Sequence, residues 1–351
     1  MDYNLLTNKS SVPKAPFIAE AGINHDGDIN TAKQMVDIAV EAKADYVKFQ
    51  SFKAEKIVTP DALTSSYIDA GSHENETFLD LLKRLELSKD DHFELKEYCD
   101  NKEIKFLSTA FDNDFFDLLM DIGSDIVKVA SGDITNIPFI RYMAERKLPM
   151  IVSTGMATLG EIEEAVKSIT IDENNDQIIL LHCISWYPAD IETTNLNYIK
   201  TLENAFGFPV GYSDHTLGIN MTVAARALGA VFFEKHFTTD STLFGPDHAA
   251  SLNPNELIDI IKGIREVELG LGNSVREFSV KEINQRKVHR RSIIAKTKIK
   301  KGDLFTIDNL VLKRPGTGVK PKHLYHILGK RAKNNLNPED LLKWSDVNLS
   351  E

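Results

Sequence analysis

One unit repeats along most of the chain: a short apolar run rich in β-branched residues, a loop, and a segment with helical periodicity. The interiors of these runs are almost continuously hydrophobic, which is typical of strands buried on both faces, as in parallel sheets. Eight strands alternating with helices over about 270 residues predict an α/β fold, the (β/α)8 TIM barrel. A doubly wound sheet is the alternative, but no Gly-rich dinucleotide-binding loop follows the first run. The predicted strands are Phe17–Gly22, Tyr46–Gln50, Lys105–Ala110, Ile126–Ser131, Met150–Gly155, Ile178–Cys183, Pro209–Asp214 and Val231–Phe237.

The segments between these strands carry helix signals. Thr31–Ala44 is predicted to be a helix that packs on a sheet, with one apolar side made of Met35, Val36, Ile38, Ala39 and Val40. Ser51–Asn75 is longer than a typical βα loop, and it is either a lid or a surface insertion. The predicted helix starts are Ser88 with Asp91, Thr158 with Glu161, and Asn253 with Pro254.

The repeat stops after Gly272, which predicts a barrel domain over residues 1–275. Residues 276–290 are polar and charged and have the composition of a linker. Short strands predicted at Arg291–Ala295, Asp303–Phe305 and Leu310–Leu312 then indicate a small β-rich domain over residues 291–351. A domain of about 60 residues is near the lower limit of independent stability, so we expect it to lean on the barrel or on another subunit.

Charge is unevenly distributed between these parts. From Lys281 onward, 17 Lys and Arg stand against 7 Asp and Glu, a balance of +10, whereas the preceding part carries −21. The basic residues are interleaved with apolar runs and lack the density of a nucleic-acid-binding arm, so we expect a basic domain that docks on an acidic body handling anions. We expect no nucleic-acid partner.

Composition also bears on the compartment. No apolar run approaches the roughly 20 residues needed to cross a bilayer, so we expect no membrane association. The N-terminal segment is polar and lacks the apolar core of a signal peptide. Cys99 and Cys183 are too few for a disulfide framework or a zinc cluster. We therefore expect a cytoplasmic protein.

Functional groups stand at the end of nearly every predicted strand, where TIM barrels build their active sites. Lys48 and Lys128 lie in strands that have no solvent-exposed edge, and a buried unpaired charge is very costly. Their partners are expected to be inward carboxylates, such as Glu20 and Glu234, or an anionic substrate. The hydroxyls at other strand ends either cap helices or donate to a phosphate; they belong to Ser131, Ser153 and Thr154.

Two histidines, His215 and His236, end the neighbouring seventh and eighth strands. They are either structural or the ligands of one divalent metal ion, which imidazole nitrogens suit. Two lysines for an anion, two histidines for a metal and several carboxylates for proton transfer favour addition of an enol to a carbonyl that the metal polarises.

At these residues the chain resembles the sialic acid synthase family, the bacterial nonulosonic acid synthases. Lys313–Gly318 resembles part of the antifreeze-like (SAF, β-clip) domain that ends these enzymes. The resemblance runs from about Pro16 to the C-terminus, and its motifs occur in the family's order. The barrel segments that carry it are Phe17–Gly27, Val47–Gln50, Ser153–Met156, Leu181–Cys183, Gly211–Thr216, Glu234–Phe237 and Gly245–His248.

The resemblance implies a carbon–carbon bond-forming transferase that condenses phosphoenolpyruvate with an N-acetylated hexosamine and water. Its products are a nine-carbon α-keto acid and phosphate. The sugar is either N-acetylmannosamine or 2,4-diacetamido-2,4,6-trideoxymannose. By the same resemblance, His215 and His236 hold a divalent metal, usually Mn²⁺, with Mg²⁺ or Co²⁺ as alternatives. The residues implied to bind phosphoenolpyruvate are Lys48, Lys128, Ser131, Ser153 and Ser213.

The sugar side is implied in the same way. Glu20 belongs to the catalytic set, and Arg314 reaches the sugar from a partner subunit, which implies a domain-swapped homodimer. Two positions depart from the family: Asp133 stands where Glu is frequent, as the acid/base near the developing carbinol, and Ser185 replaces a substrate-contacting Asn. The residues implied to lie around the sugar are Gln50, Ser185, Tyr187, Asp247 and Arg314.

Two other functions compete with the synthase. A Schiff-base aldolase would use Lys128 or Lys48 to attack a carbonyl group. A non-catalytic carbohydrate-binding protein would use the C-terminal domain and keep the barrel as a scaffold. The density of inward polar groups argues against the scaffold, because such groups weaken a barrel unless they are satisfied.

Overall fold

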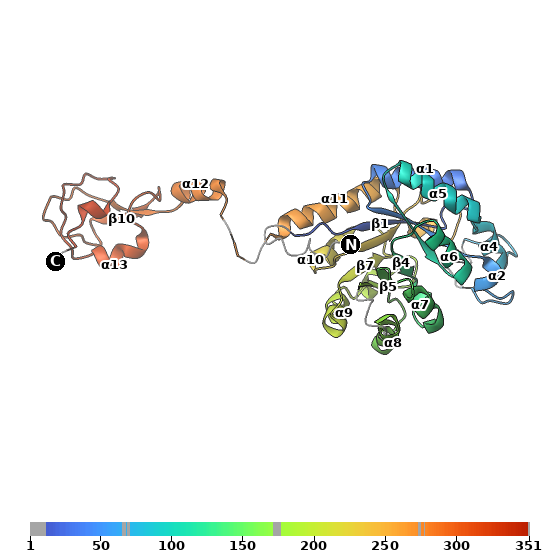
Figure 1. Cartoon of the computed structure of the whole chain (residues 1–351). Coiled ribbons are helices and arrows are strands. Elements are labelled where there is room, and N and C mark those ends of the chain that lie inside the picture. The colour runs from blue at the N-terminus through green and yellow to red at the C-terminus, as the bar shows by residue number, and fades with distance from the viewer. Residues whose placement is uncertain are drawn as a thin grey trace. The chain divides into compact units, whose positions relative to one another are not determined.

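The structure is a computed structural model that describes residues 12–64, 68, 71–170, 177–272, 275–276 and 278–349. The chain forms two compact units, Met1–Gly272 and Asn273–Glu351, which Figure 1 shows with their elements labelled. Each unit has its own hydrophobic core and is described separately below.

The first unit is a closed barrel of eight parallel strands, as the sequence predicts. Each strand pairs with the next along the chain, and β1 closes the barrel on β8 in the register Glu20 to His236. The predicted strands are confirmed to within two residues at each end. Their bounds are β1 Phe17–Gly22, β2 Tyr46–Ser51, β3 Lys105–Ala110, β4 Val127–Val129, β5 Met150–Ser153, β6 Ile178–Cys183, β7 Val210–Asp214 and β8 Phe233–His236.

Helices surround the barrel and shield the outward faces of its strands (Figure 1). Helix α1 buries Met35, Val36 and Ala39 against the sheet, as predicted, whereas Ile38 and Val40 are only partly buried. The three predicted starts are confirmed: a capping box begins α5, Thr158 and Glu161 exchange bonds before α8, and Asn253 caps α11. The helices of this unit are α1 Ile29–Glu41, α2 Ala54–Ile57, α4 Phe78–Leu85, α5 Lys89–Asn101, α6 Asn113–Asp121, α7 Ile137–Ala144, α8 Leu159–Thr170, α9 Tyr198–Phe206, α10 Asn220–Ala227 and α11 Pro254–Leu271.

A layer of apolar side chains, called the apolar plug below, fills the barrel interior toward the N-terminal ends of the strands. Because side chains alternate along a strand, every second residue points into the barrel interior, which TIM barrels fill with stacked layers of side chains. On β7 this layer has only Gly211, whose Cβ would lie 2.5 Å from Leu181 Cδ2 and 2.4 Å from the Phe232 carbonyl oxygen. The large side chains of the plug are Ile18, Tyr46, Leu107, Ile126, Ile151, Leu181 and Phe232.

The second unit contains an antiparallel pair, β9 Ser292–Ala295 and β10 Leu310–Lys313, and the helices α12 Val280–His289 and α13 Leu324–Ile327. The strand predicted at Asp303–Phe305 is wrong. Only Leu304 forms a bridge, to Arg331, while Phe305 enters the core and exchanges backbone bonds with Gly329 and Lys330. A few backbone hydrogen bonds to residues 329–331 therefore hold this segment, and it does not form the continuous hydrogen-bond ladder of a strand.

The segment predicted as a linker contains helix α12. Ser279 and Glu282 form a capping box at its start, a signal that the polar composition conceals. The helix buries none of its residues, but its Lys287 carbonyl accepts a hydrogen bond of 2.7 Å from the Gly316 N–H. Helix α12 is therefore joined to the turn that follows β10.

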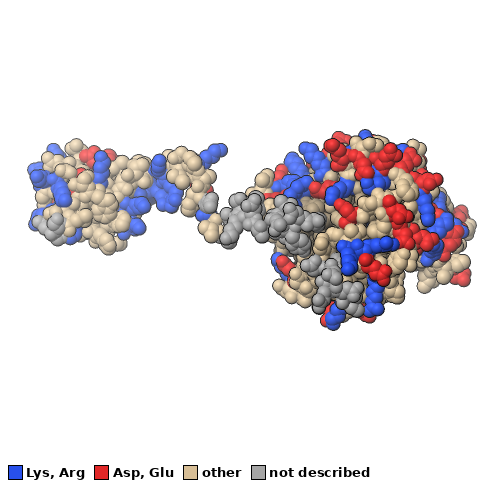
Figure 2. Space-filling model, viewed as in Figure 1, with Lys and Arg blue, Asp and Glu red and all other residues tan. Residues whose placement is uncertain are grey.

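The uneven charge predicted from the sequence is visible at the surface. In Figure 2 the visible face of the second unit shows many Lys and Arg and few Asp and Glu, whereas the barrel face shows both signs. In the part of the chain that the structure describes, no helix is long and apolar enough to span a membrane. Cys99 and Cys183 are both buried and unbridged.

Candidate active site

A layer of polar side chains lies directly above the apolar plug. Each of its members follows a plug residue by two positions, so it points into the same barrel interior one layer nearer the C-terminal strand ends. All of them line one cavity of about 590 Å³, a size typical of small-molecule sites. This polar layer consists of Glu20, Lys48, Thr109, Lys128, Ser153, Cys183, Ser213 and Glu234.

Two lysines and two glutamates form a buried charge cluster in this layer. Lys48 Nζ lies 2.8 Å from Glu20 Oε2 and 3.5 Å from Glu234 Oε2. Lys128 Nζ lies 3.8 Å from Glu234 Oε1. The pairing expected from the cost of buried charge is therefore present. Thr109 accepts a bond from Lys48 at 3.0 Å.

Burial sets the protonation of this cluster. It raises the pKa of Glu20 to about 7, with Glu234 adding to the shift and Lys48 opposing it. Burial also acts to raise the pKa of Glu234, but Lys128 and Lys48 outweigh it and lower that pKa. Burial lowers the pKa of Lys128 against the attraction of Glu234. Glu20 can therefore hold or release a proton near neutral pH, while Glu234 stays ionised.

The two histidines meet beside this cluster, with ring centroids 5.6 Å apart. His215 Nδ1 donates to the Ile184 carbonyl at 2.6 Å, which fixes the ring and leaves Nε2 unprotonated, 3.5 Å from Ser213 Oγ. His236 Nδ1 is buried and has no hydrogen-bond partner. Gly22, in a bulge with φ of 56°, makes room for this ring, since a Cβ there would lie 3.2 Å from His236 Cε1.

These histidines suit a divalent metal ion. Burial lowers the pKa of His215 to about 4 and that of His236 well below its ordinary value, so both imidazoles are neutral. A neutral ring with an uncommitted nitrogen is the form that binds a metal. Among the described residues, no group of three or more His, Cys, Asp or Glu side chains is arranged to hold a metal ion.

Hydroxyl groups crowd the side of the cavity near β5 and β6. Lys128 Nζ donates to Ser153 Oγ at 2.8 Å, and Ser131 Oγ lies 3.2 Å from Cys183 Sγ while it accepts a bond from the Gly155 N–H. Ser213 Oγ, on β7 beside Cys183, donates to Glu234 at 2.9 Å. Donors and ammonium groups thus converge where an anion could bind.

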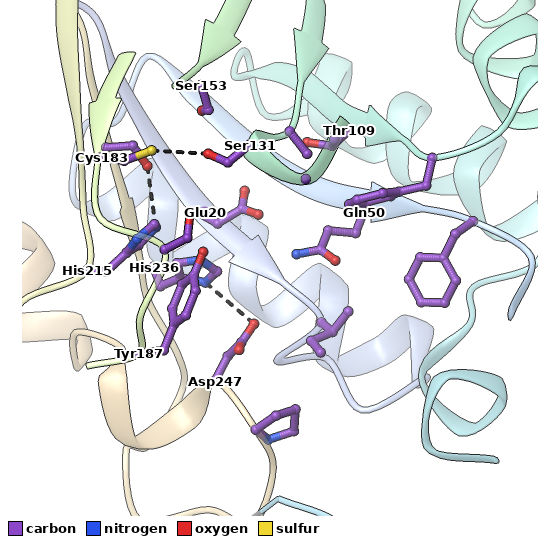
Figure 3. A pocket seen from close by; sticks show the side chains of 18 of the residues that line it. Glu20, Gln50, Thr109, Ser131, Ser153, Cys183, Tyr187, His215, His236 and Asp247 are labelled. Atoms are coloured by element: carbon purple, nitrogen blue, oxygen red, sulfur yellow. Dashed lines mark hydrogen bonds and ion pairs between the residues drawn. The ribbon is translucent and has the colours of Figure 1, made fainter. Parts of the chain in front are cut away.

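Most of the residues predicted for the sugar also line this cavity. Gln50, Tyr187 and Asp247 face the same space as Glu20 and His236 in Figure 3. The Tyr187 ring lies 4.1 Å from that of His215, measured between centroids. Ser185 Oγ is buried without a hydrogen-bond partner, and burial raises the pKa of Asp247 to about 6.

Two predicted residues lie elsewhere. Asp133 ends the short 3-10 helix Ser131–Asp133, accepts a bond from Asn136 at 3.2 Å, and is not among the residues that line the cavity. Arg314 is an exposed residue of the second unit. Their roles as acid/base and as sugar ligand stay predictions.

The sequence interpretation missed a whole side of the site. Apolar residues between β2 and α5 also line the cavity, and they include Phe52 and Ile57 from the segment interpreted as either a lid or a surface insertion. Within its described part, this segment also contacts the loop after β8, where the His73 ring stacks on Phe244 at 4.9 Å. Hydrophobic residues of this kind give the same signal as core residues.

A second missed feature is a buried ion pair behind the histidines. Asp214 and Lys235, each next to a histidine in sequence, are fully buried with 2.9 Å between Oδ2 and Nζ. Asp214 also accepts bonds from the Thr216 N–H and from the Thr222 hydroxyl, at 2.9 and 2.7 Å. The pair therefore ties β7 to β8 at the level of the histidines.

Comparison with known proteins places these features in a family. A model of the NeuB family matches residues 35–276. The chain belongs to the NeuB family. A model of the SAF domain matches residues 290–348, which confirms the second part of the resemblance.

Full-length relatives agree with this NeuB assignment. The N,N'-diacetyllegionaminic acid synthase of Legionella pneumophila is 41% identical over 334 residues, 94% of each chain. The enzyme of the same name from Campylobacter jejuni is 42% identical over 331 residues, 94% of this chain and 99% of that one. A solved structure of N-acetylneuraminic acid synthetase from Leptospira borgpetersenii, 37% identical, superposes with a TM-score of 0.69, covering 80% of this chain and 93% of that chain.

We predict that Asp214→Asn strongly destabilises the barrel of this NeuB-family chain. The substitution leaves the Lys235 ammonium buried without its counter-ion, a change that typically costs about 3–5 kcal/mol. Urea unfolding followed by circular dichroism measures the loss. The matched control is Glu163→Gln, which breaks an exposed ion pair with Lys167 and should cost less than about 1 kcal/mol. An equal loss of unfolding free energy in the two variants would show that the buried Asp214–Lys235 pair is no more important for stability than an exposed pair.

Proposed function

We propose that this chain condenses phosphoenolpyruvate with an N-acetylated hexosamine and water to give a nine-carbon α-keto acid and phosphate. The observation that carries the proposal is the convergence of the buried charge cluster and two neutral histidines in one cavity. The kinship with synthases of diacetyllegionaminic and N-acetylneuraminic acid supports it.

In the proposed reaction, C3 of phosphoenolpyruvate forms a bond with the sugar's aldehyde carbon, and the aldehyde oxygen takes up a proton. Water adds to C2, and phosphate leaves with the oxygen that joined it to C2. Glu20 suits the proton transfer, because a group with a pKa near 7 serves as acid or base at neutral pH.

Lys48 and Lys128 would bind the anion together with the surrounding hydroxyls. Burial disfavours the charged form of Lys128, so a phosphate or carboxylate placed beside it would restore that charge. The Lys128–Ser153 bond and the Gly155 N–H to Ser131 bond hold these donors at one side. Ser213 keeps Glu234 oriented between the lysines.

His215 and His236 would hold a divalent ion, with Mn²⁺ preferred and Mg²⁺ or Co²⁺ as alternatives. The ion would supply Lewis-acid polarisation of the aldehyde. The Ile184 carbonyl orients His215, and Asp247 Oδ2 lies 3.8 Å from His236 Nδ1. Gln50, Ser185 and Tyr187 would contact the sugar. We place the reaction in the cytoplasm, on the support of two buried, unbridged cysteines.

We predict that the purified protein with Mn²⁺ releases phosphate from phosphoenolpyruvate only when an N-acetylated hexosamine is present. A colorimetric phosphate assay over a small panel of such sugars measures this. The competing Schiff-base aldolase, which the lowered pKa of Lys128 favours, predicts instead a borohydride-trapped adduct with pyruvate at that lysine. Such an adduct without phosphate release would overturn the synthase.

We predict that His215→Ala and His236→Ala each weaken Mn²⁺ binding roughly 100-fold or more, because each removes a direct ligand. Electron paramagnetic resonance of free Mn²⁺ measures the affinity without any need for turnover. His182→Ala is the control, since His182 is also buried but donates from Nε2 to the Thr194 carbonyl and does not line the cavity. Unchanged Mn²⁺ affinity in both site variants would remove the metal assignment.

We also propose that Arg314 completes the partner's site in a domain-swapped homodimer, as the family resemblance implies. We predict that Arg314→Ala and Lys48→Ala chains, each inactive alone, recover about half of the wild-type activity as purified heterodimers, because one of the two sites is then intact. Phosphate release on doubly tagged heterodimers measures it. Arg291→Ala, at another exposed arginine of that unit, should stay active alone. Inactive heterodimers would rule out the swap.

A further inference from the structure

The cavity has two sides of opposite chemistry. One side is the polar layer with the histidines, which the proposed reaction uses. The other is an apolar wall that the reaction leaves unexplained. Every described residue between positions 52 and 85 that lines the cavity is hydrophobic. The apolar wall consists of Ile23, Phe52, Ile57, Val58, Ile68, Phe78, Leu81, Leu82 and Phe111.

Several residues of the wall lie at the ends of the first three strands, and others belong to helix α4. Ile23 directly follows β1, Phe52 follows β2, and Phe111 follows β3. They therefore lie just beyond the C-terminal ends of these strands, and β1 and β2 are the strands that carry Glu20 and Lys48. Phe52 and Phe111 meet edge to face, with centroids 6.2 Å apart. The apolar wall is thus continuous with the polar layer.

The side chains of the wall are closely packed, and helix α4, which carries some of them, is capped at its start. Leu81 is 1% exposed and Phe52 is 3% exposed, and both belong to one hydrophobic cluster with α2 and α4. Thr77 and Asp80 form a capping box at the start of α4, and Arg84 Nε binds Glu76 at 3.0 Å. The wall is therefore pre-formed and does not depend on a ligand for its position.

We infer that the apolar wall is the subsite for the methyl-bearing, non-reacting end of the sugar and selects a 6-deoxy amino sugar over N-acetylmannosamine. This inference rests on the proposed function. The reacting carbonyl must lie among the lysines, Glu20 and the histidines, so C6, at the far end of a hexose, extends away from them. The wall lines the part of the same cavity that lies beyond the ends of the strands carrying Glu20 and Lys48.

The chemistry of C6 then decides between the two sugars. A C6 hydroxyl against this wall gives up its hydrogen bonds to water, and no described wall side chain offers a replacement. A C6 methyl group gains from the same burial. Apolar pockets discriminate by about 10- to 100-fold between substrates that differ by one such group.

The test compares N-acetylmannosamine with its 6-deoxy analogue, which differ only at C6. With the Mn²⁺-loaded full-length protein, we expect the 6-deoxy sugar to have a kcat/KM at least about tenfold higher in phosphate release. Phe78→Ser should reduce this preference to less than about threefold, mainly by raising KM for the 6-deoxy sugar. Val58→Thr, a near-isosteric change elsewhere on the wall, should also narrow the preference for the 6-deoxy sugar.

Leu79→Ser is the matched control, because Leu79 packs on the same hydrophobic cluster but does not line the cavity. Its sugar preference should equal that of the wild type. Calorimetric dissociation constants of both sugars give a second readout that needs no turnover. Equal kcat/KM for the two sugars would overturn the wall assignment and leave the synthase in place. Tighter binding of the 6-deoxy sugar without phosphate release would support the wall and reject the synthase, and equal binding without release would reject both.

Discussion

The four ionisable groups buried in the barrel mouth impose the strongest constraint on this structure. Lys48, Lys128, Glu20 and Glu234 are each about 5% exposed or less, and each would be prohibitive there alone. Glu234 bridges the two lysines, and Glu20 takes the remaining contact of Lys48. These groups come from β1, β2, β4 and β8, so the compensation exists only when the barrel is closed.

Closure is secured by the layer beneath. Each polar residue stands two positions after a plug residue, so one strand register satisfies both layers at once. A shift by one residue would turn the charges outward and the outward core residues into the cavity. The plug supplies hydrophobic stabilisation where no ligand binds, and the layer above it can be devoted to chemistry. Stability and function are separated by about one side-chain layer along the barrel axis.

This arrangement explains which parts of the site the sequence could predict. Strand positions and the polar layer follow from a local period of two, which survives in any single strand. The apolar wall could not be recognised, because Phe52 or Leu82 has the same hydrophobic pattern whether it faces a core or a cavity. Helix α12 was hidden by its polar composition, although Ser279 and Glu282 marked its start. The orientation of Asp133 depends on a 3-10 turn that no periodicity encodes.

The two sides of the cavity would act on different kinetic quantities. Contacts with a methyl group on the apolar wall are the same in the ground state and the transition state, so they contribute to substrate binding and to KM. The proton on Glu20 and the field of the lysines act on charge that develops only during reaction, so they contribute to kcat. Because the wall continues from the strands that carry Glu20 and Lys48, sugar that is seated on the wall is also positioned against the charge cluster. Selectivity and rate enhancement thus depend on the same two strands, β1 and β2, but on different side chains of the cavity.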